Sequence, residues 1–246
     1  MPRVLGQGDA ARRYEARADA VGAAFRKAFT DEATGWVEGD CQTSYACALY
    51  HGLLAGETAR KAFDRLVGQV ERFDRHIDCG ILGAKYILRV LTDWGRPDLA
   101  WAMVTHTTFP GWGHWIAQGA TTLWETWDGE ASRNHHMFSD VGAWFHSGLA
   151  GIRPDPENPG FRHTIFRPRP DAGPDQVLSR HRSPQGEVYC GFRRDPADGD
   201  GGGGDGDRGR WIVEAGVPEG CTGTLYLPDG FADRTTLVLN GAIRLA

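Results

Sequence analysis

Glu125 is the carboxylate in this sequence whose neighbours best suit acid–base chemistry. It lies between Trp124 and Trp127, in a glycine-rich segment, 111–128, that follows no helical or strand period. A carboxylate held against indole rings loses solvation, which raises its pKa toward the range in which a side chain transfers protons near neutral pH. The pattern therefore indicates a catalytic Glu125. A buried carboxylate that accepts hydrogen bonds from backbone amides would fit the same residues equally well.

Tryptophan is concentrated around this segment. Seven of the nine tryptophans fall within about fifty residues. Rings with an apolar face and a polar edge suit a cleft that stacks on sugars and hydrogen-bonds their hydroxyls. On composition alone, a tryptophan-rich interface between helices fits as well. The seven are Trp94, Trp101, Trp112, Trp115, Trp124, Trp127 and Trp144.

The histidines and cysteines do not indicate a metal or cofactor site. His114, His135 and His136 are near one another in the sequence, but no third ligand stands at helical spacing. The five cysteines are dispersed and form no CxxC pair, which favours reduced thiols over a disulfide framework or a zinc site. We therefore expect no metal and no cofactor.

Amphipathic helices are predicted to position these residues, because six segments repeat apolar residues every three or four positions. The segments are joined by short turns with no strand pattern between them, so the first part of the chain is predicted to be all-α. They are 10–29, 41–54, 57–73, 81–94, 97–107 and 139–149.

The sequence changes in character after Gly151, where prolines become frequent and alternating apolar residues replace the helical period. Residues 183–186 separate the first two alternating runs as a hairpin turn would. An antiparallel β-sandwich is therefore predicted, with domains 1–153 and 154–246. The Asp- and Gly-rich run 195–210 favours a disordered hairpin tip over a calcium loop. The alternating runs are 176–181, 187–192, 210–215 and 223–227.

Composition argues against two classes of partner. The formal charge of −5 and the lack of a basic run argue against nucleic acid, because binding many phosphates needs a clustered basic surface. No apolar stretch reaches the roughly 18–20 residues of a membrane span. The first residues lack the apolar core of a secretory signal, so we expect a cytoplasmic location.

Several ordered motifs together resemble the bacterial α-L-rhamnosidases of glycoside hydrolase family 78. The resemblance begins at about Tyr14, covers most of the chain, and includes the segment that holds Glu125. The motifs are Gln42-Thr43, His51-Gly52-Leu53-Leu54, Gly80-Ile81-Leu82-Gly83, Pro110-Gly111-Trp112-Gly113 with the run to Trp127, Asn134-His135, Gly148-Leu149-Ala150-Gly151-Ile152 and Pro159-Gly160-Phe161.

The resemblance implies a fold, a ligand and roles for residues. Residues 1–153 would be the C-terminal half of a six-fold (α/α) barrel, a partial toroid of antiparallel helix pairs, and 154–246 the β-sandwich that follows it. The ligand would be a rhamnose-containing glycoside, hydrolysed with inversion by two carboxylates. The general base would be Glu125, the rhamnose would contact His135, and Trp112, Trp115, Trp127 and His135 would surround Glu125 on one concave surface.

The resemblance also places the general acid outside these residues. In the family it lies in the first half of the barrel, in an Asp-Glu-Arg-x-Gly-Trp type of motif. Residues 31–40 are only superficially similar to that motif, and we interpret Glu32 and Glu38 as parts of a solvated turn. Asp128 is expected to fix its own loop through backbone amides rather than to act as acid.

Two functional hypotheses follow. In the first, the chain belongs to an α-L-rhamnosidase and needs a missing N-terminal half as its partner, so that the chain alone is inactive or very feeble. In the second, it is a non-catalytic remnant of the same ancestry that at most binds sugar through its tryptophan-lined face.

Overall fold

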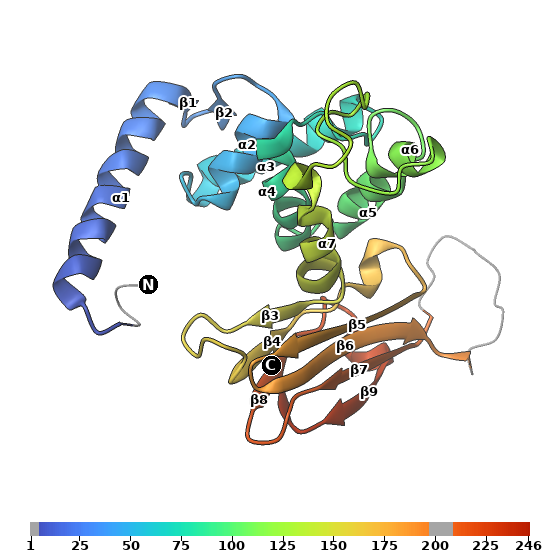
Figure 1. Cartoon of the computed structure of the whole chain (residues 1–246). Helices are drawn as coiled ribbons and strands as arrows, with labels where there is room; N and C mark the ends of the chain where they lie inside the picture. Colours follow the sequence, from blue (N-terminus) through green and yellow to red (C-terminus); the bar gives the residue numbers. More distant parts are fainter. Residues whose placement is uncertain (1–4, 197–208) are drawn as a thin grey trace. The chain divides into compact units, whose positions relative to one another are not determined.

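The computed structural model describes residues 5–196 and 209–246. The chain divides into two compact units, Met1–Val90 and Leu91–Ala246, which we describe separately (Figure 1). Most of the run 195–210, predicted as a hairpin tip, lies outside the described residues. Within the described ranges, no helix has the length and apolar character needed to cross a membrane.

The first unit is built from helices at the predicted positions. They are α1 (Gly8–Phe29), α2 (Gln42–Tyr50), α3 (Gly56–Arg72) and most of α4 (Ile81–Asp93). The apolar stripe of α3 is buried at Ala62, Leu66 and Val70, as its sequence period predicts.

One detail of this unit differs from the prediction. The turn after α1 carries two short antiparallel strands, β1 (Thr30–Asp31) and β2 (Trp36–Val37), where no strand was expected. The Asp31 carboxylate accepts hydrogen bonds from the Ala33 amide and the Thr34 hydroxyl, which closes the turn and brings the two ends into register. Strands of two residues are too short to show a sequence period.

A buried glutamine fixes the connection between α3 and α4. Gln42 is fully buried at the start of α2. Its side-chain Nε2 donates a hydrogen bond to the carbonyl oxygen of His76 at 3.0 Å, and its Oε1 accepts one from the backbone amide of Asp78 at 2.8 Å. These bonds satisfy a polar side chain that would otherwise destabilise the core.

The second unit begins with the end of α4 and a further helical layer. It contains α5 (Pro97–Thr105), α6 (Trp112–Ala117), a 3-10 turn (His136–Phe138) and α7 (Asp140–Trp144), which continues as a π-helical turn (Phe145–Leu149). The helices predicted over 97–107 and 139–149 are therefore present. The buried indole Nε1 of Trp144 donates to the Thr92 hydroxyl at 2.8 Å and ties α7 to the end of α4.

Two four-stranded sheets follow, with strand orders β10-β8-β4-β3 and β5-β6-β7-β9 (Figure 1). Both sheets contribute buried side chains to the core, among them Phe166, Phe192 and Leu225. The strands are β3 (Ile152–Pro154), β4 (His163–Phe166), β5 (Gln176–Ser183), β6 (Gly186–Arg194), β7 (Trp211–Gly216), β8 (Thr222–Leu225), β9 (Thr235–Asn240) and β10 (Ala242–Leu245), with 3-10 turns at Pro170–Ala172 and Ala232–Arg234.

The helical part followed by a β domain confirms the predicted fold class, but the sheets are mixed rather than antiparallel. The pairs β4–β8, β8–β10 and β7–β9 run parallel, whereas β3–β4, β5–β6 and β6–β7 are antiparallel. The reason is connectivity, since β4 and β8 are separated by the strands of the other sheet. Strands joined by a tight turn, as at the predicted hairpin of β5 and β6, stay antiparallel.

Candidate functional site

The loop that holds Glu125 folds as two facing arms. The amide of Glu125 donates to the carbonyl oxygen of Ser132 at 2.8 Å, and the amide of His135 donates to that of Leu123 at 2.9 Å. Glu125 and His135 therefore lie on opposite arms of one loop, joined by a turn at 126–129.

The Glu125 side chain is half-buried and oriented by the backbone. Its Oε2 accepts a hydrogen bond from the amide of Ser132 at 3.2 Å. In residues 5–196 and 209–246, no cation forms an ion pair with this carboxylate, and no hydrogen bond to its Oε1 is made. Glu125 thus has one oxygen held and one available to accept a proton.

An aromatic cluster forms the interior of the loop. Trp127 is its centre, with ring centroids 4.7 Å from Trp115, 5.2 Å from Trp112 and 4.2 Å from Phe138. Trp124 joins it through Trp115, at 5.7 Å. These rings come from three segments of the chain, α6, the Glu125 arm and the 3-10 turn, and their contacts hold the three segments together.

Two of the expected sugar-contacting tryptophans are core residues of this cluster. Trp112 and Trp115 are only 6% and 2% exposed. Their indole N–H groups donate to the carbonyl oxygens of Phe138, at 3.1 Å, and Trp127, at 2.8 Å. Both residues therefore position the loop, and the half-buried Trp127 is the more accessible ring. Contact of any of them with a sugar remains a prediction.

His135 keeps an unused hydrogen-bonding atom. The side chain is half-buried, and its Nδ1 is a buried atom with no hydrogen-bond partner in the part of the chain that the structure describes. Such atoms are rare in folded proteins. His135 also stacks on His136, with centroids 5.9 Å apart and ring planes 13° apart.

Arg133 contributes to the loop and was not identified from the sequence. Its guanidinium lies 4.7 Å from the centre of the Trp124 ring, and its Nε donates to the carbonyl oxygen of Gly129 at 3.0 Å. Gly129 has φ +71°, and a Cβ there would lie 2.4 Å from the Trp124 ring. The residue type alone gave no signal, because a single Arg in a polar loop is ordinarily solvated.

Asp128 fixes the turn, as predicted. Its Oδ1 accepts hydrogen bonds from the Thr126 hydroxyl at 2.6 Å and from the Glu130 amide at 3.0 Å. These bonds hold the pKa of the Asp128 carboxyl below its usual value. These bonds engage the carboxylate within its own turn, and the identity of the general acid stays a prediction.

Glu32 and Glu38 belong to the first unit and are both exposed beside the β1–β2 turn. The Glu32 carboxylate lies 3.9 Å from the Arg26 guanidinium, and the Glu32 carbonyl oxygen accepts a hydrogen bond from the Thr58 hydroxyl at 3.1 Å. The interpretation of both as residues of a solvated turn is therefore confirmed.

Metal-binding side chains are not clustered in the part of the chain that the structure describes. Across the described ranges, no group of three or more His, Cys, Asp or Glu side chains is arranged to hold a metal ion. All five cysteines are free, and burial raises the pKa of the Cys79 thiol to about 12, which keeps it protonated at neutral pH.

Two family models match the chain in sequence order. Residues 1–149 match the bacterial α-L-rhamnosidase six-hairpin glycosidase domain, and residues 151–201 match the bacterial α-L-rhamnosidase C-terminal domain.

Individual relatives agree with these matches. An α-L-rhamnosidase of Streptomyces avermitilis is 31% identical over 223 residues, covering 85% of this chain and 20% of the relative. One from an Alteromonas species is 33% identical over 177 residues, covering 67% of this chain and 19% of the relative. The chain thus spans about a fifth of the length of the curated relatives it matches.

Solved structures show the same fold. The S. avermitilis α-L-rhamnosidase complexed with L-rhamnose matches with a TM-score of 0.82 and 30% identity, over 95% of this chain and 22% of that one. The α-L-rhamnosidase from Dictyoglumus thermophilum matches with a TM-score of 0.81 and 29% identity, over 94% and 25%. With a family model covering 149 of its 246 residues, the chain belongs to the bacterial α-L-rhamnosidase six-hairpin glycosidase family.

Proposed function

We propose that this chain is the C-terminal portion of an inverting α-L-rhamnosidase in which Glu125 is the general base. The observation that carries the proposal is the two-armed loop. It orients the Glu125 carboxylate through the Ser132 amide and sets His135, with its unused Nδ1, on the facing arm. The proposal is supported by the resemblance to the family's motifs, which implies a base and a rhamnose contact at these two positions.

The proposed reaction uses the free oxygen of Glu125. Oε1 takes a proton from a water molecule, and the water oxygen attacks the anomeric carbon of the rhamnose from the side opposite the leaving oxygen. The bond from the anomeric carbon to the leaving oxygen breaks with its electron pair, and that oxygen receives a proton from the general acid. His135 hydrogen-bonds the rhamnose in this scheme, while Trp112, Trp115 and Trp127 shape the site around it.

The general acid is proposed to come from an N-terminal half of the barrel, beyond the 246 residues. An inverting pair needs carboxyl groups roughly 6.5–9.5 Å apart, and Asp128 is committed to its turn. The apolar face of α1 supports a further partner, since Tyr14, Val21 and Phe29 are 60%, 56% and 47% exposed. Residues 1–153 and 154–246 are proposed to be the barrel portion and the β domain of that enzyme.

The test is hydrolysis of an aryl α-L-rhamnoside by the chain alone and by the chain joined to an N-terminal half that carries the acid motif. We expect little or no hydrolysis by the chain alone and restored hydrolysis after joining, with β-L-rhamnose as the first product in a proton NMR time course. Robust hydrolysis by the 246 residues alone would overturn the missing acid and return Glu32 and Glu38 as candidates. Sugar binding without hydrolysis in the joined protein would favour a non-catalytic remnant.

A further inference from the structure

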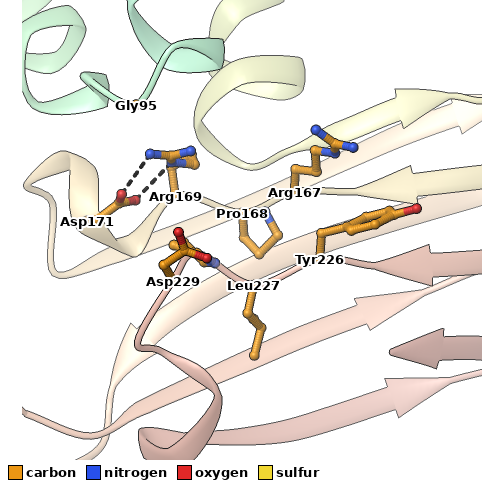
Figure 2. A pocket seen from close by; sticks show the side chains of 9 residues that line it. Gly95, Arg167, Pro168, Arg169, Asp171, Tyr226, Leu227 and Asp229 are labelled. Carbon is orange, nitrogen blue, oxygen red and sulfur yellow. Dashed lines mark hydrogen bonds and ion pairs between the residues drawn. The ribbon is translucent and has the colours of Figure 1, made fainter. Parts of the chain in front are cut away.

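A pocket lies in the unit 91–246, where two neighbouring parallel strands end. Phe166, the last residue of β4, and Leu225, the last residue of β8, are register partners. The segments that leave these strands, 167–169 and 226–229, line a pocket of about 470 Å³ (Figure 2). That volume is within the range of small-molecule sites, and none of the lining residues belongs to the Glu125 loop.

The backbone around this pocket is fixed before any ligand arrives. The amide of Tyr226 donates to the carbonyl oxygen of Phe166, and the amide of Arg167 donates to that of Gly151, both at 2.9 Å. Gly151 has φ +80°, and a Cβ there would lie 2.1 Å from the carbonyl carbon of Arg167, so the close approach requires glycine. Preformed walls lower the ordering cost of binding.

Arg167 presents unused donors to the pocket. Its guanidinium carbon lies 4.6 Å from the centre of the Tyr226 ring, a cation–π contact that holds the side chain without using any N–H group. Among the residues that the structure describes, no hydrogen bond or ion pair engages this guanidinium. Figure 2 shows Arg167 above Tyr226 at one end of the pocket.

The other end of the pocket carries three charged groups. Arg169 donates from Nε and Nη2 to the two carboxylate oxygens of Asp171 at 2.9 and 2.7 Å, and this bidentate pair neutralises both charges. Asp229 lies below the pair in Figure 2, exposed, and within the described ranges its carboxylate accepts no hydrogen bond. The pocket thus offers donors on Arg167 and acceptors on Asp229.

The charges decide between ligand classes. Two arginines and two aspartates give a formal charge of zero, and Arg169 and Asp171 pair with each other, so a phosphate or sulfate would meet the negative Asp229 as well as the positive Arg167 and gain no net attraction. A hydroxyl both donates and accepts, so a sugar with hydroxyls on opposite sides of its ring can take a hydrogen bond from Arg167 at one end and give one to Asp229 at the other. We propose that this pocket binds a neutral sugar unit with hydroxyls on both sides of its ring, as a second carbohydrate site separate from Glu125.

Such a site would hold a glycan on the β domain independently of hydrolysis. The binding partner would be a mono- or disaccharide unit of a larger glycan, and attachment there would raise the local concentration of other units of the same molecule.

The test is nuclear magnetic resonance of the ¹⁵N-labelled 246-residue chain carrying Glu125→Gln and His135→Ala, which weaken sugar binding at the first site. Six ligands are titrated separately: L-rhamnose, D-glucose, D-galactose, maltose, cellobiose and inorganic phosphate. The Arg167 Nε–Hε signal is assigned by its loss in Arg167→Gln. We expect saturable shifts of this signal with at least one neutral sugar. Two variants, Asp229→Asn and Arg167→Gln, should each weaken sugar binding about ten-fold, as the loss of one charge-assisted hydrogen bond does. Because Arg167→Gln lacks the Nε–Hε signal, its binding is followed through backbone amide signals.

Matched controls are Arg162→Gln and Asp233→Asn, exposed residues that do not line the pocket. Both should leave sugar affinity unchanged, with circular dichroism confirming that every variant is folded. The proposal is overturned if no neutral sugar gives a saturable shift, if Arg167→Gln and Asp229→Asn bind as tightly as the parent, or if phosphate alone binds. Because Glu125 and His135 are already replaced, failure here leaves the proposed hydrolysis standing.

Discussion

Glu125 and Ser132 are joined by two hydrogen bonds in opposite directions. The amide of Glu125 donates to the Ser132 carbonyl oxygen at 2.8 Å, and the amide of Ser132 donates to the Glu125 carboxylate at 3.2 Å. The first bond aligns the arms of the loop, and the second orients the side chain. The backbone therefore orients the Glu125 carboxylate, and no cation in the described part of the chain forms an ion pair with it. A carboxylate without an ion pair is better suited to act as a base than one that pairs with a cation.

Gly129 tests how tightly the turn is packed against Trp124. Gly129→Ala introduces a Cβ 2.4 Å from the Trp124 ring at φ +71°. It should cost about 2–4 kcal/mol of unfolding free energy, from left-handed strain plus overpacking. Urea unfolding followed by tryptophan fluorescence measures this change.

Gly119→Ala is the matched control, because Gly119 has φ +80° and nothing within 4 Å of its would-be Cβ. It should cost only the strain, about 1–2 kcal/mol. Equal losses in the two variants would mean that contact with Trp124 does not shape the turn.

Arg133 tests how much its own contacts stabilise the same turn. Arg133→Ala removes the contact with the Trp124 ring and the hydrogen bond to the Gly129 carbonyl oxygen. We expect a loss of about 1–2 kcal/mol in unfolding free energy, the sum of one such contact and one hydrogen bond. Arg162→Ala, a change at an exposed arginine, should stay within about 0.5 kcal/mol of the parent. A loss no larger than that of the control would show that Arg133 is merely solvated.

Asp128 predicts part of the pH dependence of stability. Its folded pKa is lowered by the Thr126 hydroxyl and the Glu130 amide. Its contribution is therefore fully present above the unfolded pKa of about 3.9 and is lost as pH falls through the lower folded value. Asp128→Asn should flatten the decline in unfolding free energy below pH 5, measured by urea titration at several pH values. An unchanged slope in Asp128→Asn would contradict this expectation.

The sequence predicted the helices well because α3, α4 and α5 bury one face each, and a single buried face produces the 3.6-residue period. It did not predict β4, which lies outside the four alternating runs, and it could not give the parallel pairing of β4 with β8, since alternation identifies a strand but not its direction. It also missed Arg133, whose partners, Trp124 and the Gly129 carbonyl oxygen, are brought together by a turn. Composition alone left the tryptophans undecided between a sugar cleft and a core, and the burial of Trp112 and Trp115 shows that packing uses much of that aromatic surface.

The most direct test of the account is Glu125→Ala in the enzyme completed with its N-terminal half. Removal of the base should lower kcat on an aryl α-L-rhamnoside by about 10²–10⁴-fold, and Glu130→Ala, at a nearby exposed carboxylate, should not. Azide needs no deprotonation and fits the space that the carboxylate leaves, so it should restore release of the aryl group and yield β-L-rhamnosyl azide. Undiminished hydrolysis by Glu125→Ala without azide would contradict the assignment of Glu125 as general base.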